Sequence, residues 1–490
     1  PGLRDSPGVR RQDAMGSFLG DGAVPTDLRS LYESHGQGQV FEYVDKGVVK
    51  GKDVDALVQQ LQTINPARVN ELYKATVTVA AAGASTLRPI EPIESVARLA
   101  FASEEEKGGW YSAGLRAVAE GKVGVIVLSG GQGTRLGFSG PKGMYDIGLP
   151  SGKTLFQLQA ERLRRVCTLA DEMAGAGHQG GPSGIPWYIM TSALNDKVTR
   201  EFFAQHDYFG VPKEDITFFP QGTLPCLTPE GKIMLESAGK VAEAPDGNGG
   251  IYPALQRTGA LADMRKRGVE HLHVFSIDNA LVRVADPHFI GYCATRGADC
   301  GNKSVWKTNP DEKVGVVVTR GGRPAVVEYS EMDPEACART EASSGRLVFG
   351  AGNICNHYFS RAFLEDTVIP NLGDMYHIAR KKIPGAAGEL GETCKPQENN
   401  GMKLESFIFD VFPLSQKMAV FESPREDEFA PVKNAPGSDT DSPDTARAMI
   451  SEQAKRWVSA AGATLAPPGE GGGGCCEVSP LVSYGGEGLE

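Results

Sequence analysis

Two hydrophobic patterns divide this chain. Over residues 27–118 apolar residues recur at helical spacing, as Leu57 and Leu61 do, and few stretches alternate in the way of strands. The pattern then changes to VGVIVL at 123–128, a run typical of a buried strand, which precedes a glycine-rich turn and a helix expected over 154–173. The sequence therefore predicts a helical N-terminal region followed by a core of strands and helices.

The order strand, loop, helix repeats along that core. The segment WYIM at 187–190 precedes a helix expected near 195–206, a short strand is expected at 217–219, and HVFSI at 273–277 follows a helical stretch at 254–267. Alternating strands and helices are typical of a mostly parallel sheet. The predicted fold class is therefore α/β.

The remaining segments are assigned by composition. Proline, glycine and arginine without apolar periodicity predict a disordered tail, and glycine-rich stretches at 174–184 and 467–474 are expected to be surface loops. After residue 412, VFPLSQKMAVFE and LVSY predict a smaller C-terminal region that contains strands. The predicted domains are a tail, a helical region, a core domain and a C-terminal domain, at 1–26, 27–118, 119–412 and 413–490.

Composition narrows the function. The 490 residues hold 50 Lys and Arg against 61 Asp and Glu, a net charge of −11, which disfavours nucleic acid as the main partner. No apolar run approaches the ~18 residues of a membrane span, and no signal peptide is visible at the start. Nine cysteines without a CxxC pair argue against a disulfide scaffold and a thiolate zinc cluster, and reduced thiols predict a cytoplasmic protein without a membrane partner.

The densest chemistry follows the first core strand. The turn SGGQGTRLG at 129–137 presents backbone N–H groups without side-chain obstruction, which suits a phosphate or a flat base. Arg135 and Lys142 add two cations, and the combination fits a triphosphate. The alternative is a tight turn with solvated basic residues.

Two familiar phosphate-binding motifs fail by spacing. For G-x-G-x-x-G, Gly131 and Gly133 fit, but Leu136 occupies the third position, which argues against a nicotinamide-dependent oxidoreductase. For G-x-x-x-x-G-K-[ST], residues 152–154 fit, but Ile147 stands where the first glycine belongs. The loop therefore belongs to neither class.

A carboxylate follows the strand at 273–277. Ligands of open α/β sheets bind beyond the carboxyl ends of the strands, and a carboxylate there suits Mg²⁺ that bridges phosphates. Asp278 is therefore the metal candidate. An Asp-Asn pair at a strand end is also ordinary turn chemistry.

Other polar positions are weaker candidates. Asn248, in the loop APDGNGG, offers a hydrogen-bond donor and an acceptor, although such a loop is by itself a turn. His271 and His273 share a strand face without a third ligand at zinc spacing, so they are expected to be packing residues. No nucleophile motif indicates covalent catalysis.

The segment LSGGQGTRLGFSGPKGMYDIGLPSGKT at 128–154 resembles the signature loop of the eukaryotic-type UDP-N-acetylhexosamine (UDP-N-acetylglucosamine) pyrophosphorylases, within the UDPGP family of uridylyltransferases. Further segments from about Trp110 to the end are similar to this family in the same order, among them APDGNGGIY (244–252), AGNICNHYF (351–359) and CEVSPLVSYGGEGLE (476–490). On these matches the chain is identified as a member of the family.

The resemblance implies a fold and a reaction. The fold is a Rossmann-like nucleotidyltransferase core with a mostly parallel mixed sheet, flanked by the helical N-terminal region and a smaller β-containing C-terminal domain. The reaction converts UTP and N-acetylglucosamine 1-phosphate, or its galactosamine epimer, into a UDP-sugar and pyrophosphate, with Mg²⁺ or Mn²⁺ as the cofactor. A sugar phosphate is already an anionic nucleophile, so the absence of a general base agrees with this chemistry.

The family's site residues map onto this chain by motif. Nucleotide-binding positions fall on Leu128, Ser129, Gly130, Gly131, Gly133, Gln221, Gly247 and Lys403. The catalytic cations are Arg135, Lys142 and Lys433, and the metal-binding residue is Asp278. The sugar contacts correspond to Asn248, Glu328, Tyr329, Asn353, Phe407 and Phe409. Phe407 and Phe409, two residues apart on an expected strand, would share one face and wall the sugar.

Some features depart from the family or leave alternatives. Ser129 replaces a usual alanine, Gly152 replaces a common basic residue, and the chain stops at Glu490, so an incomplete C-terminal domain is expected. A broader UDP-sugar pyrophosphorylase and a nucleotide-sugar sensor without turnover are the alternatives. The segment at 351–353 with Glu328 argues against the first, and the intact metal and phosphate set against the second. The preferred epimer, and the choice between monomer and homodimer, stay open.

Overall fold

The computed structural model describes residues 22–82, 89–175, 183–465 and 474–490, which form two compact units. Unit 1 comprises Pro1–Ala75, Leu224–Ala244 and Ile378–Lys403, and unit 2 comprises Thr76–Thr223, Pro245–His377 and Leu404–Glu490. Each unit combines segments that are distant in the sequence. The linear domain boundaries expected above stay a prediction. Most of the expected tail and most of each expected glycine-rich loop lie outside the described residues.

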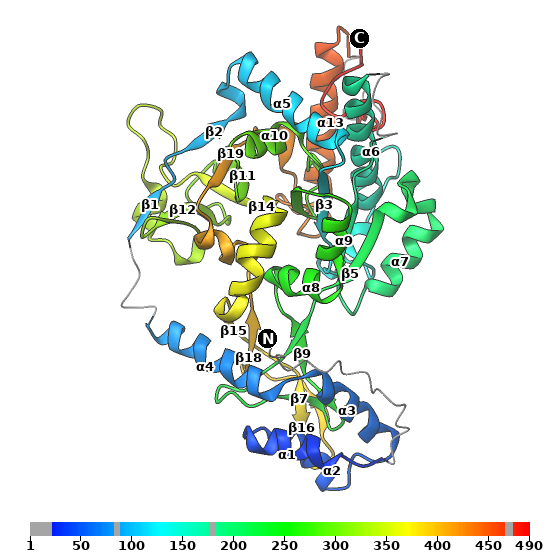
Figure 1. The fold of residues 1–490 in the computed structure, drawn as a ribbon, viewed down its shortest axis with the longest axis vertical. Helices are drawn as coiled ribbons and strands as arrows, with labels where there is room; N and C mark the ends of the chain where they lie inside the picture. Colours follow the sequence, from blue (N-terminus) through cyan, green and yellow to red (C-terminus); the bar gives the residue numbers. More distant parts are fainter. Residues whose placement is uncertain (1–21, 83–88, 176–182, 466–473) are drawn as a thin grey trace, which may run out of the picture. The chain divides into compact units, whose positions relative to one another are not determined.

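Unit 2 is built on a sheet that has eleven strands within the described ranges (Figure 1). Its main order is β2, β19, β11, β14, β10, β3, β4 and β5, at Val96–Arg98, Met418–Glu422, Cys300–Trp306, Ala351–Ser360, His271–Ser276, Val123–Leu128, Trp187–Thr191 and Ile216–Pro220. β1 (Ile90–Pro92), β12 (Val316–Arg320) and β13 (Arg323–Val327) extend it antiparallel through β14. On the main path only β14 runs antiparallel to its neighbours, so the mostly parallel mixed sheet is confirmed.

Helices cover both faces of this sheet. The helices that lie wholly within unit 2 are α5 (Glu104–Ala119), α6 (Leu155–Ala174), α7 (Asp196–Gln205), α8 (Ile251–Arg257), α9 (Ala260–Lys266), α10 (Pro287–Thr295), α11 (Pro334–Ala338), α12 (Arg425–Glu428) and α13 (Pro443–Ala460). In β3, Val125 and Val127 pack with residues of α6 and α13, whereas Ile126 and Leu128 pack with residues of α8 and α9. Every residue of β3 is therefore buried, as the continuous apolar run predicted.

Two local predictions need correction. The helical stretch expected at 254–267 is two helices, α8 and α9, because Gly259 takes φ +79° between them. The segment LVSY at 481–484 is a turn and not a strand. There the backbone N–H of Tyr484 donates to Glu487 Oε1 at 2.8 Å, and a side chain that binds its own backbone locally competes with strand pairing.

Unit 1 carries the N-terminal helices α1 (Thr26–Ser34), α2 (Glu42–Asp45), α3 (Lys52–Thr63) and the first part of α4 (Pro66–Ala82). The buried Tyr32 hydroxyl donates to the carbonyl of Leu61 at 2.8 Å, which fixes α1 to α3. Small two-stranded sheets complete the chain: β7–β8 (Leu235–Ser237, Lys240–Val241), β16–β17 (Gly385–Ala387, Glu392–Cys394), β6–β9 (Thr223–Pro225, Glu243–Pro245) and β15–β18 (His377–Lys381, Gly401–Glu405). Among the described helices we find none with the length and apolar character that crossing a membrane requires.

Candidate active site

The carboxyl ends of neighbouring parallel strands carry several predicted site residues. Ser129 follows β3, Gln221 follows β5, and Asp278 lies two residues beyond β10. Parallel strands end at the same edge of a sheet, so these residues lie along one edge of unit 2.

The glycine-rich loop after β3 folds back on itself. Gly133 N–H donates to the carbonyl of Gly140 at 2.9 Å, and Lys142 N–H donates to the carbonyl of Gly131 at 3.2 Å. Gly131 itself is exposed, with open space beside its Cα. The loop thus offers accessible backbone next to Lys142, an arrangement that an anion can approach.

Gln221 lies against the start of this loop. A Cβ on Gly130 would come 2.6 Å from Gln221 Oε1, so the side chain of Gln221 lies close against the backbone of Gly130. Gln221 N–H donates to the carbonyl of Thr191 at 2.9 Å, and Ser129 N–H donates to the carbonyl of Met190 at 2.8 Å. Bonds between strand ends therefore bring two predicted nucleotide-binding positions, Gly130 and Gln221, together.

Asp246 is a site candidate that the sequence analysis missed. It is 4% exposed, and its N–H donates to the carbonyl of Gly222 at 3.3 Å, directly after Gln221. Burial raises the pKa of its carboxyl to about 7, and Oδ1 has no hydrogen-bond partner within the described part of the chain. The only signal in the sequence was the turn-like loop APDGNGG.

The next residues of that loop pack on the segment 406–408. Gly247 has φ +88°, and a Cβ there would lie 2.2 Å from the carbonyl oxygen of Ser406, so only glycine fits. Asn248 Oδ1 accepts Ile408 N–H at 2.9 Å, and the Tyr252 hydroxyl donates to the carbonyl of Ile408. The side-chain N–H₂ of Asn248 has no hydrogen-bond partner among the described residues.

Lys142 and Asp278 lie close together in the part of the site that is predicted to bind the substrate phosphates, the phosphate end, which also includes Lys433. Lys142 Nζ lies 3.5 Å from Asp278 Oδ2, and the two side chains are 17% and 18% exposed. Val432 N–H donates to the carbonyl of Asp278 at 2.8 Å, so Lys433 follows directly after a residue bound to Asp278. The structure thus assembles a carboxylate and a lysine from segments that are far apart in the sequence, with a second lysine beside them.

Asp441 is a second residue that the sequence analysis missed. Its carbonyl accepts Lys433 N–H at 2.7 Å, and it takes φ +52°, which is unusual for a residue other than glycine. Burial raises the pKa of its carboxyl, Lys433 opposes that rise and Asp278 adds to it. No motif marks Asp441, because only the return of the loop from 434 to 441 brings it beside Lys433.

The phosphate end fits the Mg²⁺ that the family resemblance implies. Within the described residues no cluster of three or more His, Cys, Asp and Glu side chains could hold a metal ion. Mg²⁺ usually takes one or two carboxylates and completes its shell with water and substrate phosphates. The half-buried carboxylate of Asp278, with Asp441 as its neighbour, offers oxygen donors of the kind that such an ion needs.

A cavity of about 340 Å³ collects part of the predicted sugar site. Glu328, Phe407 and Phe409 line it, together with His377 and Asp410. The rings of Phe407 and Phe409 are stacked, with centroids 5.1 Å apart. Burial raises the pKa of the Glu328 carboxyl. A stacked aromatic wall beside polar groups is a surface that can bind a sugar ring and an acetyl methyl group.

The expected strand at Phe407 and Phe409 is wrong. Phe407 precedes a 3₁₀ helix at Ile408–Leu414, and its N–H donates to Asp410 Oδ2 at 2.7 Å. The acceptor on Asp410 favours a helix start over continued strand pairing. The two rings nevertheless face the same cavity, as the alternation on a strand would also have placed them.

Other predicted residues are not brought to these clusters. Tyr329 is 42% exposed and Asn353 lies on β14, and neither lines the sugar cavity. Arg135 is exposed and shows no contact with Asp278 among the described residues. Lys403 lies on β18 in unit 1, and its place near the phosphates stays a prediction.

The two histidines of β10 behave as packing residues. His273 is fully buried, burial lowers its pKa to about 3, and its Nε2 is 2.7 Å from Asn356 Oδ1. His271 Nδ1 is 2.7 Å from the Tyr358 hydroxyl. The packing role predicted for both is confirmed. All nine cysteines are unpaired in the structure.

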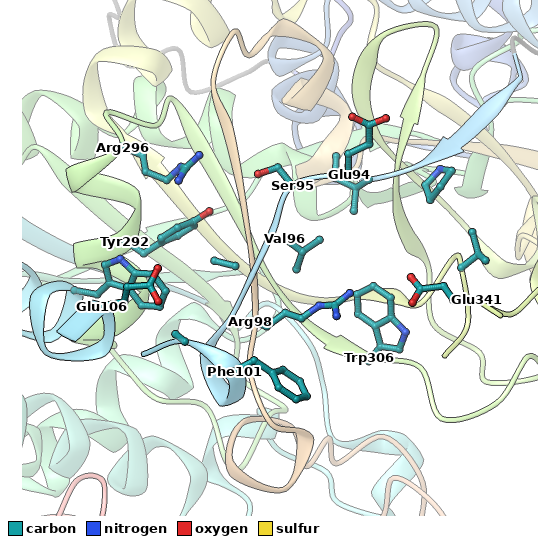
Figure 2. A pocket seen from close by; sticks show the side chains of 16 residues that line it. Glu94, Ser95, Val96, Arg98, Phe101, Glu106, Tyr292, Arg296, Trp306 and Glu341 are labelled. Carbon is teal, nitrogen blue, oxygen red and sulfur yellow. The ribbon is translucent and has the colours of Figure 1, made fainter. Parts of the chain in front are cut away.

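A second cavity, of about 680 Å³, lies elsewhere in unit 2 (Figure 2). Strand β2 and Trp306 line it, and Arg98 lies over the Trp306 ring at 5.3 Å. Its charged groups are of both signs, including Glu94, Glu341 and Arg296, and none of the predicted site residues lines it. The residues at the sheet edge are therefore better suited to bind a phosphate ligand than the residues of this cavity.

The protein family described as "UTP--glucose-1-phosphate uridylyltransferase" matches residues 93–463. The chain belongs to this family. Similarity to individual uridylyltransferase relatives extends over almost the whole chain. The chain is 45% identical to human "UDP-N-acetylhexosamine pyrophosphorylase-like protein 1", and the alignment covers 96% of this chain and 94% of that protein. Identity to the "UDP-N-acetylglucosamine pyrophosphorylase" of Saccharomyces cerevisiae is 39%, covering 95% and 96%.

A solved structure supports the fold of this uridylyltransferase family member. The UDP-N-acetylglucosamine pyrophosphorylase of Trypanosoma brucei, solved with an inhibitor, superimposes with a TM-score of 0.80 at 29% identity, covering 95% of each chain. The α/β fold and the family predicted from the sequence are thus confirmed.

Proposed function

We propose that this protein is a uridylyltransferase that converts UTP and N-acetylglucosamine 1-phosphate, or its galactosamine epimer, into the UDP-N-acetylhexosamine and pyrophosphate. The observation that supports it most is the pair Lys142 and Asp278, 3.5 Å apart beside the glycine-rich loop. The relatives named above carry names for this activity.

The reaction needs alignment and charge neutralisation. An oxygen of the sugar phosphate attacks the α-phosphorus of UTP, the bond from that phosphorus to the oxygen bridging to the β-phosphate breaks, and the electron pair leaves with pyrophosphate. No proton has to be removed, because the nucleophile is already an anion. Arg135, Lys142 and Lys433 would hold the two mutually repelling anions together.

Asp278 would hold Mg²⁺, or Mn²⁺, with Asp441 close by. When bound, the ion neutralises charge that develops on the departing pyrophosphate. The donor set is suitable because carboxylate oxygens and phosphates are the ligands that Mg²⁺ prefers.

The remaining site residues divide by substrate. In this proposal the residues that bind the nucleotide are Leu128, Ser129, Gly130, Gly131, Gly133, Gln221, Gly247 and Lys403. The residues that bind the sugar are Asn248, Glu328, Tyr329, Asn353, Phe407 and Phe409. Unpaired cysteines support a cytoplasmic location for the protein.

The proposal is tested by pyrophosphate release from UTP and Mg²⁺, with N-acetylglucosamine 1-phosphate, N-acetylgalactosamine 1-phosphate and glucose 1-phosphate offered in parallel. We expect release with the N-acetylated pair, and the ratio within that pair gives the preferred epimer. Equal release with glucose 1-phosphate would indicate the broader pyrophosphorylase. No pyrophosphate release with any of the three sugar phosphates, in a sample that binds UDP-sugar, would contradict catalysis and favour a nucleotide-sugar sensor.

A further inference from the structure

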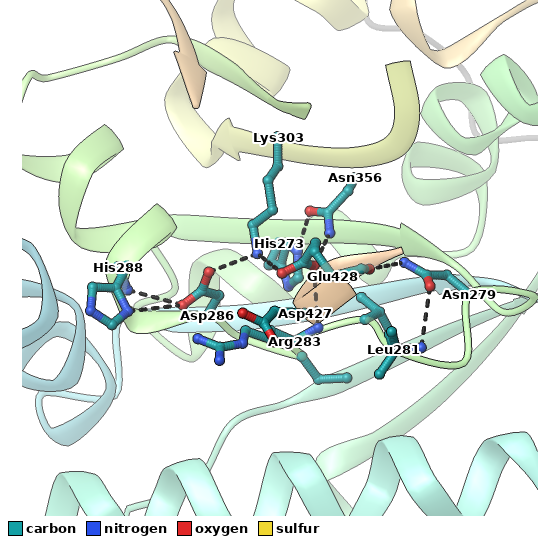
Figure 3. A network of polar contacts seen from close by, with 12 residues as sticks. His273, Asn279, Leu281, Arg283, Asp286, His288, Lys303, Asn356, Asp427 and Glu428 are labelled. Atoms are coloured by element: carbon teal, nitrogen blue, oxygen red, sulfur yellow. Dashed lines mark hydrogen bonds and ion pairs between the residues drawn. The ribbon is translucent and has the colours of Figure 1, made fainter. Parts of the chain in front are cut away.

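Lys303, Asp286 and Glu428 form a buried group of charged side chains in unit 2 (Figure 3). Lys303 on β11 donates to Asp286 Oδ2 at 2.7 Å and to Glu428 Oε2 at 2.8 Å. The side chains of Lys303 and Asp286 are 0% exposed and that of Glu428 is 1% exposed. Figure 3 shows the Lys303 ammonium between the two carboxylates.

Stability alone explains this group poorly. Taking charges out of water is costly, and replacing a buried ion pair with well-packed apolar side chains is often neutral or stabilising. An arrangement of this kind is better explained by what it holds in place.

Glu428 connects the charged group to the turn after β10. Its Oε1 accepts Asn356 Nδ2–H at 2.9 Å and Arg283 N–H at 3.2 Å. Its backbone carbonyl accepts Asn279 Nδ2–H at 2.7 Å. Asn279 is the residue after the metal candidate Asp278.

Further hydrogen bonds join residues 278–280, after β10, to residues 430–432, after α12. Asn279 Oδ1 accepts Ala430 N–H at 3.0 Å, and Ala280 N–H donates to the carbonyl of Ala430 at 3.0 Å. Val432 N–H donates to the carbonyl of Asp278 at 2.8 Å. One segment therefore begins at Asp278, and the other leads directly into Lys433.

We propose that Lys303, Glu428 and Asn279 form a clamp of positioning residues that sets the spacing between the Asp278 carboxylate and the Lys433 ammonium. This inference rests on the proposed function, in which both groups act on substrate phosphates. A misplacement of about 1 Å far from the reacting atoms can cost about a hundredfold in rate, so the clamp controls turnover although it touches no substrate.

The charge states of the clamp agree with this role. Burial raises the pKa of Glu428 to about 7, against the opposing effect of Lys303. Burial also acts on Asp286, but Lys303 and His288 outweigh it and hold the pKa of Asp286 well below its usual value. The charged groups that act on Glu428 are Lys303, Asp286 and Arg283, and Arg162 and the Tyr484 hydroxyl also interact with it. A proton on Glu428 would turn an acceptor into a donor, so turnover is expected to fall as the pH drops through about 7.

The test compares Glu428→Gln with the matched control Glu161→Gln. Glu161 is also buried, at 4% exposure, and likewise accepts a lysine ammonium and a side-chain amide, from Lys153 at 2.7 Å and Gln157 at 3.0 Å. For Glu428→Gln we expect kcat to fall at least about tenfold, the half-saturating Mg²⁺ concentration to rise, and KM for the sugar phosphate to stay within about twofold. Its kcat should also lose the acid limb near pH 7. The control should change none of these.

A second readout does not depend on turnover. In Glu428→Gln the backbone amides of Ala430 and Val432 should exchange hydrogen at least about tenfold faster, and in Glu161→Gln they should not. If the wild-type protein releases no pyrophosphate, the proposed function fails, while the exchange rates still decide whether the clamp holds these segments.

Two results would overturn the clamp. One is a folded Glu428→Gln variant with wild-type kcat and Mg²⁺ dependence, and the other is unchanged protection of both amides. If Glu428→Gln does not fold, Asn279→Ala takes its place, because it leaves the buried charges intact and removes the link to residues 428–430, together with one hydrogen bond from Leu281 N–H. The same changes in kcat, Mg²⁺ dependence and exchange are expected, and their absence contradicts the proposal.

Discussion

The phosphate end and the sugar end of the candidate site are built in different ways. At the phosphate end, half-buried charges meet on segments fixed by backbone bonds, such as Val432 N–H to the carbonyl of Asp278. At the sugar end, the stacked rings of Phe407 and Phe409 wall a cavity of about 340 Å³. Rigid charges suit a step shared by all substrates, whereas an aromatic cavity suits discrimination among sugars. Changes at the two ends should therefore alter different kinetic constants.

The largest effect is expected from Asp278→Asn. Losing the metal-binding carboxylate should lower kcat at least about a hundredfold, near 3 kcal/mol, because one electrostatic contact to the transition state is removed. Pyrophosphate release across a Mg²⁺ titration measures it, and Asp53→Asn, on an exposed helix position, is the control. Turnover that survives in Asp278→Asn with undiminished Mg²⁺ dependence would contradict the metal-binding role of Asp278 at the phosphate end.

Lys142→Met should follow in size. The variant keeps the chain length but removes the charge 3.5 Å from Asp278, and we expect about a hundredfold loss in kcat with little change in KM for the sugar phosphate. Single-turnover kinetics separate chemistry from product release. Lys197→Met is the matched control, since that side chain is 88% exposed on α7. Equal losses in both variants would mean that general charge, and not this position, matters.

At the sugar end, Phe409→Leu should mainly raise KM. Removing one ring of the stacked pair should raise KM for the N-acetylated sugar phosphate about tenfold and leave KM for UTP unchanged. Phe101→Leu, at a ring that is 76% exposed in the cavity of Figure 2, serves as the control. A fall in kcat at unchanged KM would show that the two ends are not separable in this way.

The smallest effect concerns pH and His377, which lines the sugar cavity. The hydrogen bond to Asp410 raises the pKa of His377, so its stabilising contribution is full below the ordinary pKa of histidine and is lost as the pH rises through the raised value. The loss of unfolding free energy in His377→Gln should be larger at about pH 5.5 than at about pH 8.5. It should stay under about 1 kcal/mol, because the side chain is half exposed. Urea unfolding at both values measures it, and a loss that grows with pH would contradict the assignment.

Local patterns predicted much of the nucleotide side. The run at 123–128 had to be a strand covered on both faces, and glycines after it had to form a turn, because these properties follow from neighbouring residues. Asp278 was found for the same reason, since it directly follows the strand expected at 273–277 and lies two residues beyond β10. The pairing of Lys142 with Asp278 could not be read from spacing, as the two are brought together by the order of β3 and β10 in the sheet.

The missed residues share one property. Asp246 and Asp441 gain their environments from segments that return from far along the chain or from a loop closing on itself, and burial shifts the pKa of both. Burial of a polar side chain depends on what packs over it, which periodicity does not reveal. The same limit explains the wrong strand prediction at Phe407. The residues there resemble a strand, but a 3₁₀ helix begins after Phe407 because Asp410 accepts its N–H.

The sequence by itself determined the α/β class, the family, the glycine-rich loop and the chemical types in the site, because these depend on residue identity and short-range order. Tertiary structure alone decided which charges meet, how the chain divides into two units of discontinuous segments, and that Lys303 is buried between two carboxylates. The physical reason is that distances and desolvation arise from contacts between residues far apart in the chain, and no local pattern encodes them.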